Sequence, residues 1–321
     1  MMKDGCEIVV RPRGGLCNRM YVIAAAHTLA RRVNKKAKIV WVIDWRLGTR
    51  YEDLFQPLEG LSFDTYFWKG AEQEGSMLER ARAAYYSTTV FNTTKLSQHT
   101  SRLSVLANLP YYSEIRWRLL RWTKQQLRRA EFDVIIESGQ TRSGLAESEI
   151  ENVRRSKKTF MITNHEFIEP DIEYGTFFRL QPELRKLVDT ATQDITNETI
   201  GVHIRRTDHG RAIQQSPEEA FRHAMRKEVK QNPDATFFLA TDSAETKQSL
   251  QEAFGSRILS ADVPLTRKST NGIQGAITDL YGLAKTKKIL GSHASTFSGM
   301  AAKIGGIPLV RVSSEEAIPI Q

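Results

Sequence analysis

Short apolar runs typical of buried strands alternate with amphipathic helical patterns through both halves of the chain. This alternation favours parallel sheets whose strands are joined by crossover helices, so we predict an α/β protein. A length of 321 residues allows two domains that each bury a core. The expected strands are 7–10, 38–43, 133–137, 159–163, 199–204, 236–240, 288–290 and 308–312.

The helical patterns fall between these strands and support the same division of the chain. The expected helices are 18–34, 181–194, 217–231, 244–254, 273–285 and 296–304. Periodicity is weak from 51 to 113, which predicts an irregular insertion at about 51–130 with short helices. We therefore expect a first domain over 1–170 and a second over 171–321, with 164–175 as a connection between them.

Composition limits the class of protein and its partners. Hydrophobic residues at 40% and charged residues at 26% are typical of a soluble globular chain. The N-terminus lacks the apolar core of a signal peptide, so a cytoplasmic location is the expectation. Cys6 and Cys17 form no CxxC motif, and neither a disulfide framework nor a zinc site is indicated. A net charge of +9 favours acidic partners such as nucleotides, nucleic acid or an anionic membrane.

The positive charge is concentrated between Arg116 and Arg129, where tryptophan and leucine interrupt a run of basic residues without an acidic one. This segment has three interpretations. It is a solvated amphipathic helix, a surface that docks peripherally on an anionic membrane or a lipid-linked acceptor, or a nucleic-acid contact. Nucleic acid is the least favoured of the three, because no nucleic-acid motif accompanies the segment.

The strand expected at 199–204 ends in an unusual group of polar residues, namely His203, Arg205, Arg206 and Asp208. Ligands of open α/β sheets bind at the carboxyl ends of parallel strands. Arginine's planar fork matches phosphate oxygens, so the group predicts an anion site. The alternative is a solvated strand end or an ion pair with a carboxylate.

Two further strands of the second half end in polar residues, Thr241-Asp242-Ser243 and Ser292-His293-Ala294-Ser295-Thr296. In a parallel sheet all three ends lie on one edge, which strengthens the functional interpretation. Ser295 and Thr296 begin a predicted helix, where backbone N–H groups favour a phosphate. Ordinary capping of that helix is the alternative.

In the first half, Gly14 and Gly15 lie between the first strand and the first helix. The motif is neither a dinucleotide fingerprint nor a Walker loop. It is either a tight turn or a point where the backbone approaches a ligand closely.

Together these motifs resemble those of the GDP-fucose fucosyltransferase superfamily, which includes the α1,6-, α1,2- and protein O-fucosyltransferases. The resemblance rests on the Gly14–Arg19 loop, the His203–Asp208 run, Thr241-Asp242-Ser243, and Asp279 through Ser298. It implies a GT-B arrangement, in which two facing Rossmann-like domains hold GDP-fucose in a cleft. The second domain would bind most of this nucleotide-sugar donor.

The resemblance also implies roles for individual residues. Arg205 would stabilise the β-phosphate as GDP leaves, with Arg206 in support. His203 and Asp279 would meet the guanine. The ribose and phosphate oxygens would be held by Asp242, Ser292, Ser295 and Thr296, and the cleft would be closed by Gly14, Gly15 and Asn18.

The sequence contains no Asp-x-Asp triplet that would tether a donor through a metal, so no metal is expected. Inverting chemistry, typical of this superfamily, follows from the resemblance. The α1,6 branch favours a glutamate as general base shortly after the second arginine, but no carboxylate stands there in this sequence. Asp208 and His209 are the nearest candidates, and Asp44 at the end of the second strand is a more distant one. The alternative for Asp208 is a structural role, in which it orients the arginines. Strict α1,6 activity is not predicted.

The sequence thus predicts an inverting, metal-independent fucosyltransferase that acts on a glycan or glycolipid hydroxyl. Two alternatives stay open. One is an enzyme of the same fold that uses another nucleotide-sugar. The other is a non-catalytic basic protein that binds nucleic acid or membranes through the segment from Arg116 to Arg129.

Overall fold

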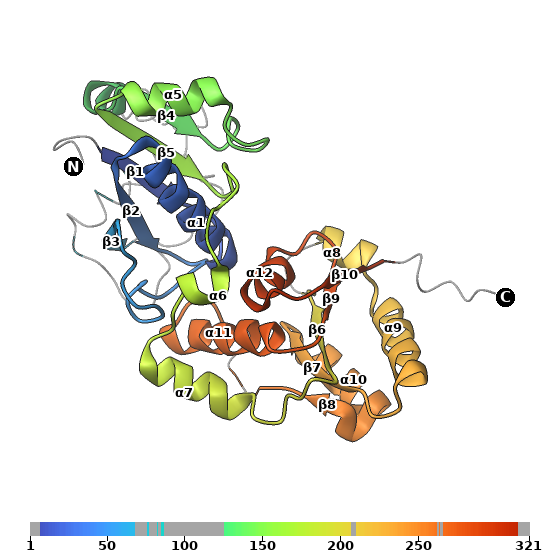
Figure 1. Cartoon of the computed structure of the whole chain (residues 1–321). Coiled ribbons are helices and arrows are strands. Elements are labelled where there is room, and N and C mark those ends of the chain that lie inside the picture. The colour runs from blue at the N-terminus through green and yellow to red at the C-terminus, as the bar shows by residue number, and fades with distance from the viewer. Residues whose placement is uncertain are drawn as a thin grey trace, which may run out of the picture.

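A computed structural model describes residues 7–67, 76, 82, 85–86, 125–206, 210–261, 263 and 266–313. These residues form two five-stranded parallel sheets flanked by helices, one sheet from each half of the chain (Figure 1). The α/β class is therefore confirmed. Asp208, His209 and residues 116–124 of the basic tryptophan segment lie outside the described residues.

The first sheet has the strand order β3-β2-β1-β5-β4, and all its strands are parallel. Its elements are β1 (Glu7–Pro12), α1 (Leu16–Val33), β2 (Lys36–Ile43), β3 (Leu61–Phe67), β4 (Val134–Glu137), α5 (Glu147–Arg155) and β5 (Lys158–Thr163). The predicted strands and the first helix agree with these bounds to within two residues, whereas α5 was not predicted.

The expectation of an irregular segment after residue 51 is wrong for β3. This strand pairs with β2 in parallel at the edge of the sheet. An edge strand is only partly covered, so it carries polar residues such as Ser62 and Asp64 and lacks the continuous apolar run of a central strand.

The second sheet has the order β10-β9-β6-β7-β8, again with all strands parallel. Its strands are β6 (Thr199–Ile204), β7 (Thr236–Thr241), β8 (Ile258–Leu259), β9 (Ile289–Ser292) and β10 (Leu309–Val312). The helices of this half are α6 (Tyr174–Phe177), α7 (Pro182–Ala191), α8 (Gly210–Gln215), α9 (Glu218–Gln231), α10 (Ala244–Phe254), α11 (Thr270–Ala284) and α12 (Thr296–Gly305). The short elements α6, α8 and β8 were not predicted, because one or two turns or a two-residue strand leave no periodicity to detect. In the described part of the chain, no helix is long and apolar enough to span a membrane.

The two halves share a buried apolar core. Helices α11 and α12 lie between the second sheet and the elements α1 and α6 (Figure 1). One cluster of buried side chains runs from Ile8 and Met20 on the first side to Ile277 and Met300 on the second. Burial of this apolar area fixes how the two sheets face each other.

A close backbone approach adds to this junction. The Gly48 N–H donates to the Arg267 carbonyl over 2.9 Å, and a Cβ added to Gly48 would lie 2.0 Å from the Lys268 carbonyl oxygen. Only glycine allows this contact without movement of the backbone.

We expect Gly48→Ala to lower the free energy of unfolding by about 1–3 kcal/mol, because the backbone must shift to relieve the overlap. Thermal or urea unfolding measures the change. Gly139→Ala is the matched control, since a Cβ at Gly139 meets no atom within 4 Å. Equal stability of the two variants would contradict this interpretation of the junction.

Candidate functional site

A cavity of about 620 Å³ lies between the two sheets, and both halves of the chain line it. The predicted site residues in its lining are Gly15, Asn18, His203, Arg205, Asp242, Asp279, Ser295 and Thr296. Gly14, Arg206 and Ser292 are not in the lining. The cavity has the size of sites that bury small organic ligands.

Arg205 lies at the carboxyl end of β6, where the guanidinium is held in place. Its Nε is 3.2 Å from the Asp242 Oδ2, and both side chains are about one-fifth exposed, at 20% and 21%. Its backbone N–H donates to the Ser292 Oγ over 3.0 Å. Since β6 pairs with both β7 and β9, the prediction that the three polar strand ends share one edge is confirmed.

Ser292 and Arg206 support this edge from behind. The buried Ser292 hydroxyl donates to the His203 carbonyl over 3.3 Å. The backbone N–H of Arg206 donates to the Asp242 Oδ1 over 2.7 Å. The Nη1 of Arg206 donates to the Ser216 carbonyl. These contacts fix the strand ends, so both residues act on the cavity through Arg205 and Asp242.

His203 faces the cavity from β6 and is otherwise enclosed. Its Nδ1 lies 2.8 Å from the Ser298 Oγ, and its ring stacks on Phe297 with centroids 4.8 Å apart. Burial and the nearby Arg205 lower the pKa of His203 to about 3. The imidazole is therefore neutral near pH 7 and offers hydrogen bonds without a positive charge.

Asp279 reaches the same cavity from α11. Burial raises the pKa of its carboxyl to about 8, and Lys247 offsets only part of this effect. The carboxyl is therefore mostly protonated at pH 7.

The glycine loop brings the first half to the cavity. Gly14 has φ +87°, a left-handed conformation that favours glycine. The Asn18 Nδ2 donates to the Asn164 carbonyl over 3.1 Å, and the Thr296 hydroxyl donates to the Asn18 Oδ1 over 3.0 Å. Asn18 thus joins the first half to the start of α12.

Of the base candidates, Asp44 is the one that lies within the described residues. Its carboxylate pairs with Arg19 at 3.2 Å and with Arg11 at 3.8 Å, and it does not line the cavity. Glu166 does line the cavity, and sequence reasoning missed it. It accepts from the Tyr174 hydroxyl over 2.9 Å and lies 3.5 Å from the Lys303 Nζ. Glu166 follows the carboxyl end of β5 by three residues, and this position at a strand end could have predicted it as a site residue.

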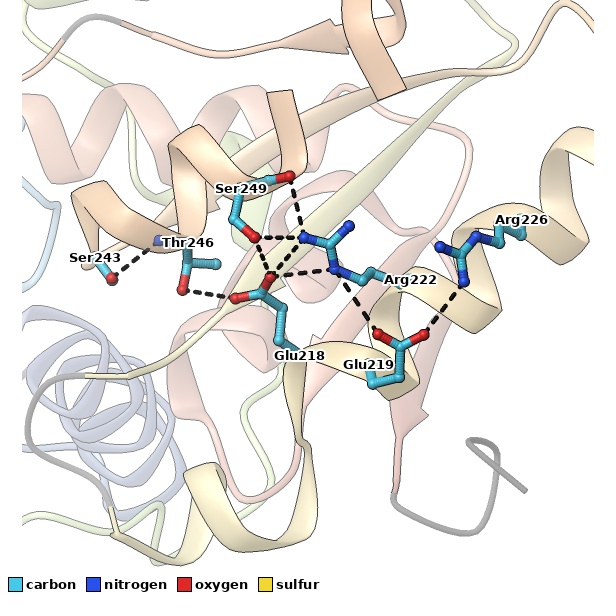
Figure 2. Close-up of polar contacts among 7 residues, drawn as sticks. All are labelled: Glu218, Glu219, Arg222, Arg226, Ser243, Thr246 and Ser249. Atoms are coloured by element: carbon cyan, nitrogen blue, oxygen red, sulfur yellow. Dashed lines mark hydrogen bonds and ion pairs between the residues drawn. The ribbon is translucent and has the colours of Figure 1, made fainter. Parts of the chain in front are cut away.

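A polar network behind the site ties α9 to α10, the helices that follow β6 and β7 (Figure 2). Glu218 on α9 accepts from Arg222, from Ser249 at 2.6 Å and from Thr246 at 3.2 Å. These hydrogen bonds outweigh burial and lower the pKa of Glu218. Because α9 and α10 follow the strands that end at Arg205 and Asp242, the network supports the geometry of that pair.

No three His, Cys, Asp or Glu side chains gather to hold a metal ion within the ranges that the structure describes. The ionisable groups of the cavity include the Arg205–Asp242 pair, with Arg46, Arg267, Glu166 and Asp279 around it.

Comparison of the sequence finds no matching protein-family model and no matching curated protein. Comparison of the structure finds glycosyltransferases. NodZ α-1,6-fucosyltransferase soaked with GDP-fucose is 15% identical, with a TM-score of 0.55 and coverage of 98% of this chain and 97% of that one. A mutant of Arabidopsis thaliana FUT1 in complex with GDP is 14% identical, with a TM-score of 0.55 and coverage of 98% and 72%.

POFUT1 in complex with GDP-fucose is 10% identical, with a TM-score of 0.50 and coverage of 97% and 99%. Likeness at such identities shows the fold. The chain therefore has the α/β fold of these fucosyltransferases, and the predicted GT-B-like arrangement of two parallel sheets is confirmed.

Proposed function

We propose that this protein is a glycosyltransferase that moves fucose from GDP-fucose to a hydroxyl of a glycan or glycolipid. The observation that carries the proposal is the Arg205–Asp242 pair at the converging strand ends, inside a cavity that both halves of the chain line. The solved structures that share this fold include complexes with GDP-fucose and GDP.

In this proposal the diphosphate of the donor lies against Arg205, whose guanidinium matches its oxygens. The hydroxyl of Thr296 and the N-terminus of α12 face the same anion. Neutral His203 and the Asp279 carboxyl lie within the cavity to take the guanine. Asp242 holds Arg205 in place, with Ser295 beside the ribose and phosphates.

The transfer is proposed to invert the anomeric carbon. An acceptor hydroxyl attacks that carbon, the bond to the β-phosphate oxygen breaks, and GDP leaves with the electron pair. Arg205, with Arg206 behind it, stabilises the charge that develops on the diphosphate, which is the task a metal ion performs in other enzymes. The proton of the hydroxyl passes to a base, for which Asp208 and His209 are the candidates from the sequence.

A thermal-shift panel tests the donor class. We expect GDP to raise the melting temperature more than UDP, ADP or dTDP at equal concentration, because ligands that bind the native state stabilise it by mass action. A larger shift with UDP or dTDP would indicate that the donor is a nucleotide-sugar other than GDP-fucose. No response to any nucleotide, together with salt-dependent binding to DNA, RNA or liposomes, would favour the non-catalytic alternative.

A further inference from the structure

A second group of positive charges lies at the carboxyl edge of the first sheet, and one of its members, Arg46, lines the same cavity as Arg205. Arg11 and Arg13 stand at and just after the end of β1, Arg46 follows β2, and Arg19 projects from α1. Since β1 and β2 are parallel neighbours, their ends meet. We call these four residues the arginine cluster.

Asp44 is the carboxylate that pairs with the arginine cluster among the described residues. It lies 3.2 Å from the Arg19 Nη2 and 3.8 Å from the Arg11 Nη2, and it accepts the Arg46 backbone N–H over 2.9 Å. Glu137, at the end of β4 in the same sheet, also attracts the Arg13 guanidinium. Four arginines are thus offset by two carboxylates, and this edge keeps a net positive charge.

Two of the arginines are buried, so their charge is poorly screened by water. Arg19 is 0% exposed, and it donates to the Val42 and Gly14 carbonyls. Arg11 is 5% exposed, and its Nε has no hydrogen-bond partner among the described residues. Burial and the neighbouring arginines lower the pKa of Arg11 to about 9. Such crowding is costly unless an anion compensates it.

The other two arginines are accessible. Arg13 and Arg46 are half-buried, and the guanidinium of neither has an ion pair or hydrogen bond within the described part of the chain. Arg46 lines the cavity and lies 4.6 Å from the ring centroid of Trp45. Trp45 is 55% exposed, so an exposed aromatic side chain stands beside the Arg46 guanidinium.

We propose that the arginine cluster binds an oxyanion of the acceptor, a phosphate or a carboxylate carried by the glycan. Arg13 and Arg46 contact the anion. The buried Arg11 and Arg19 contribute positive electrostatic potential without touching it. The exposed face of Trp45 packs against the adjoining sugar. This inference rests on the proposed function, in which the second sheet takes the donor diphosphate and leaves the first sheet to the acceptor.

The first test uses pyrophosphate as the probe, with saturating GDP to occupy the donor site. We expect pyrophosphate to raise the melting temperature further in the wild type. The double variant Arg13→Gln/Arg46→Gln should weaken this binding by about tenfold or more, as expected for loss of two charge-assisted contacts. Arg142→Gln is the control, because Arg142 is exposed on the same half of the chain. Equal affinity in the wild type and the double variant would overturn the proposal.

Weaker pyrophosphate binding by the double variant would not be explained by misfolding. Removal of two crowded charges should keep or raise the melting temperature of the free protein, which the same experiment measures. If GDP itself fails to bind, the proposed function fails. The pyrophosphate titration is then repeated in Arg205→Ala protein, where the arginine cluster alone is measured.

The second test identifies the source of the anion. Glycans that carry phosphate, glycans that carry a uronic carboxylate and matched neutral glycans are offered as acceptors with saturating GDP-fucose. We expect transfer to an acidic glycan, and an increase of about tenfold in KM with kcat retained in the double variant. Transfer to neutral glycans with the same KM in both proteins would overturn the proposal.

Discussion

Arg205→Ala is expected to abolish the rise in melting temperature caused by GDP and to slow GDP release from GDP-fucose by about 100- to 1000-fold. The guanidinium lies at the edge where β6, β7 and β9 end, held by Asp242 at 3.2 Å. In the proposed function this guanidinium meets the charge that develops on the departing diphosphate. Its loss should therefore remove both ground-state binding and transition-state stabilisation.

Two controls separate this effect from a general loss of structure. Arg142→Ala removes an exposed arginine from the first half and should leave both measurements unchanged. Arg205→Lys keeps the charge but loses the planar fork, so it should retain part of the GDP response and little of the rate. If Arg205→Ala keeps the wild-type GDP shift and rate, the diphosphate does not lie against Arg205.

The predicted elements are those whose apolar residues form either a continuous run, as in a buried strand, or a helical repeat over several turns. Buried central strands such as β6 and β7 are continuous apolar runs, and the polar residues directly after them mark the edge where the site forms. Edge strand β3 escaped because its outer residues are polar. The sequence pattern therefore locates central strands and the residues at their ends. It does not locate an edge strand, because partial exposure interrupts the apolar run.

The direction of individual side chains is a second limit. Ser292 and Thr296 both follow from the same strand-end motif, yet one is buried among backbone groups and the other faces the cavity and Asn18. That difference depends on the packing of β6 against β9 and of the two halves against each other. The arginine cluster was hidden for the same reason, because its members come from three elements that meet only in the folded chain.

Asp279→Asn is expected to change stability and GDP binding in opposite directions. Burial raises the pKa of this carboxyl from 3.8 to about 8 in the folded protein. The native state therefore holds one proton more than the unfolded chain between these values. The resulting stability is fully present below about pH 4 and is lost as the pH rises through about 8. Asparagine does not titrate, so the variant should be more stable than the wild type near pH 8.

GDP binding should show the reverse dependence. The guanine presents N–H donors, which an ionised carboxylate accepts better than a protonated one, so GDP affinity should increase as the pH rises from about 6 to about 8. The increase is at most about tenfold per pH unit, the limit for release of one proton.

In Asp279→Asn both the affinity and its pH dependence should fall, which calorimetric titration at several pH values measures. Asp189→Asn is the matched control, because Asp189 is an exposed carboxylate on α7 outside the cavity. A GDP affinity that is equally insensitive to pH in the wild type and in Asp279→Asn would remove Asp279 from the guanine site. The proposed roles of Arg205 and of the arginine cluster do not depend on this result, because separate experiments test them.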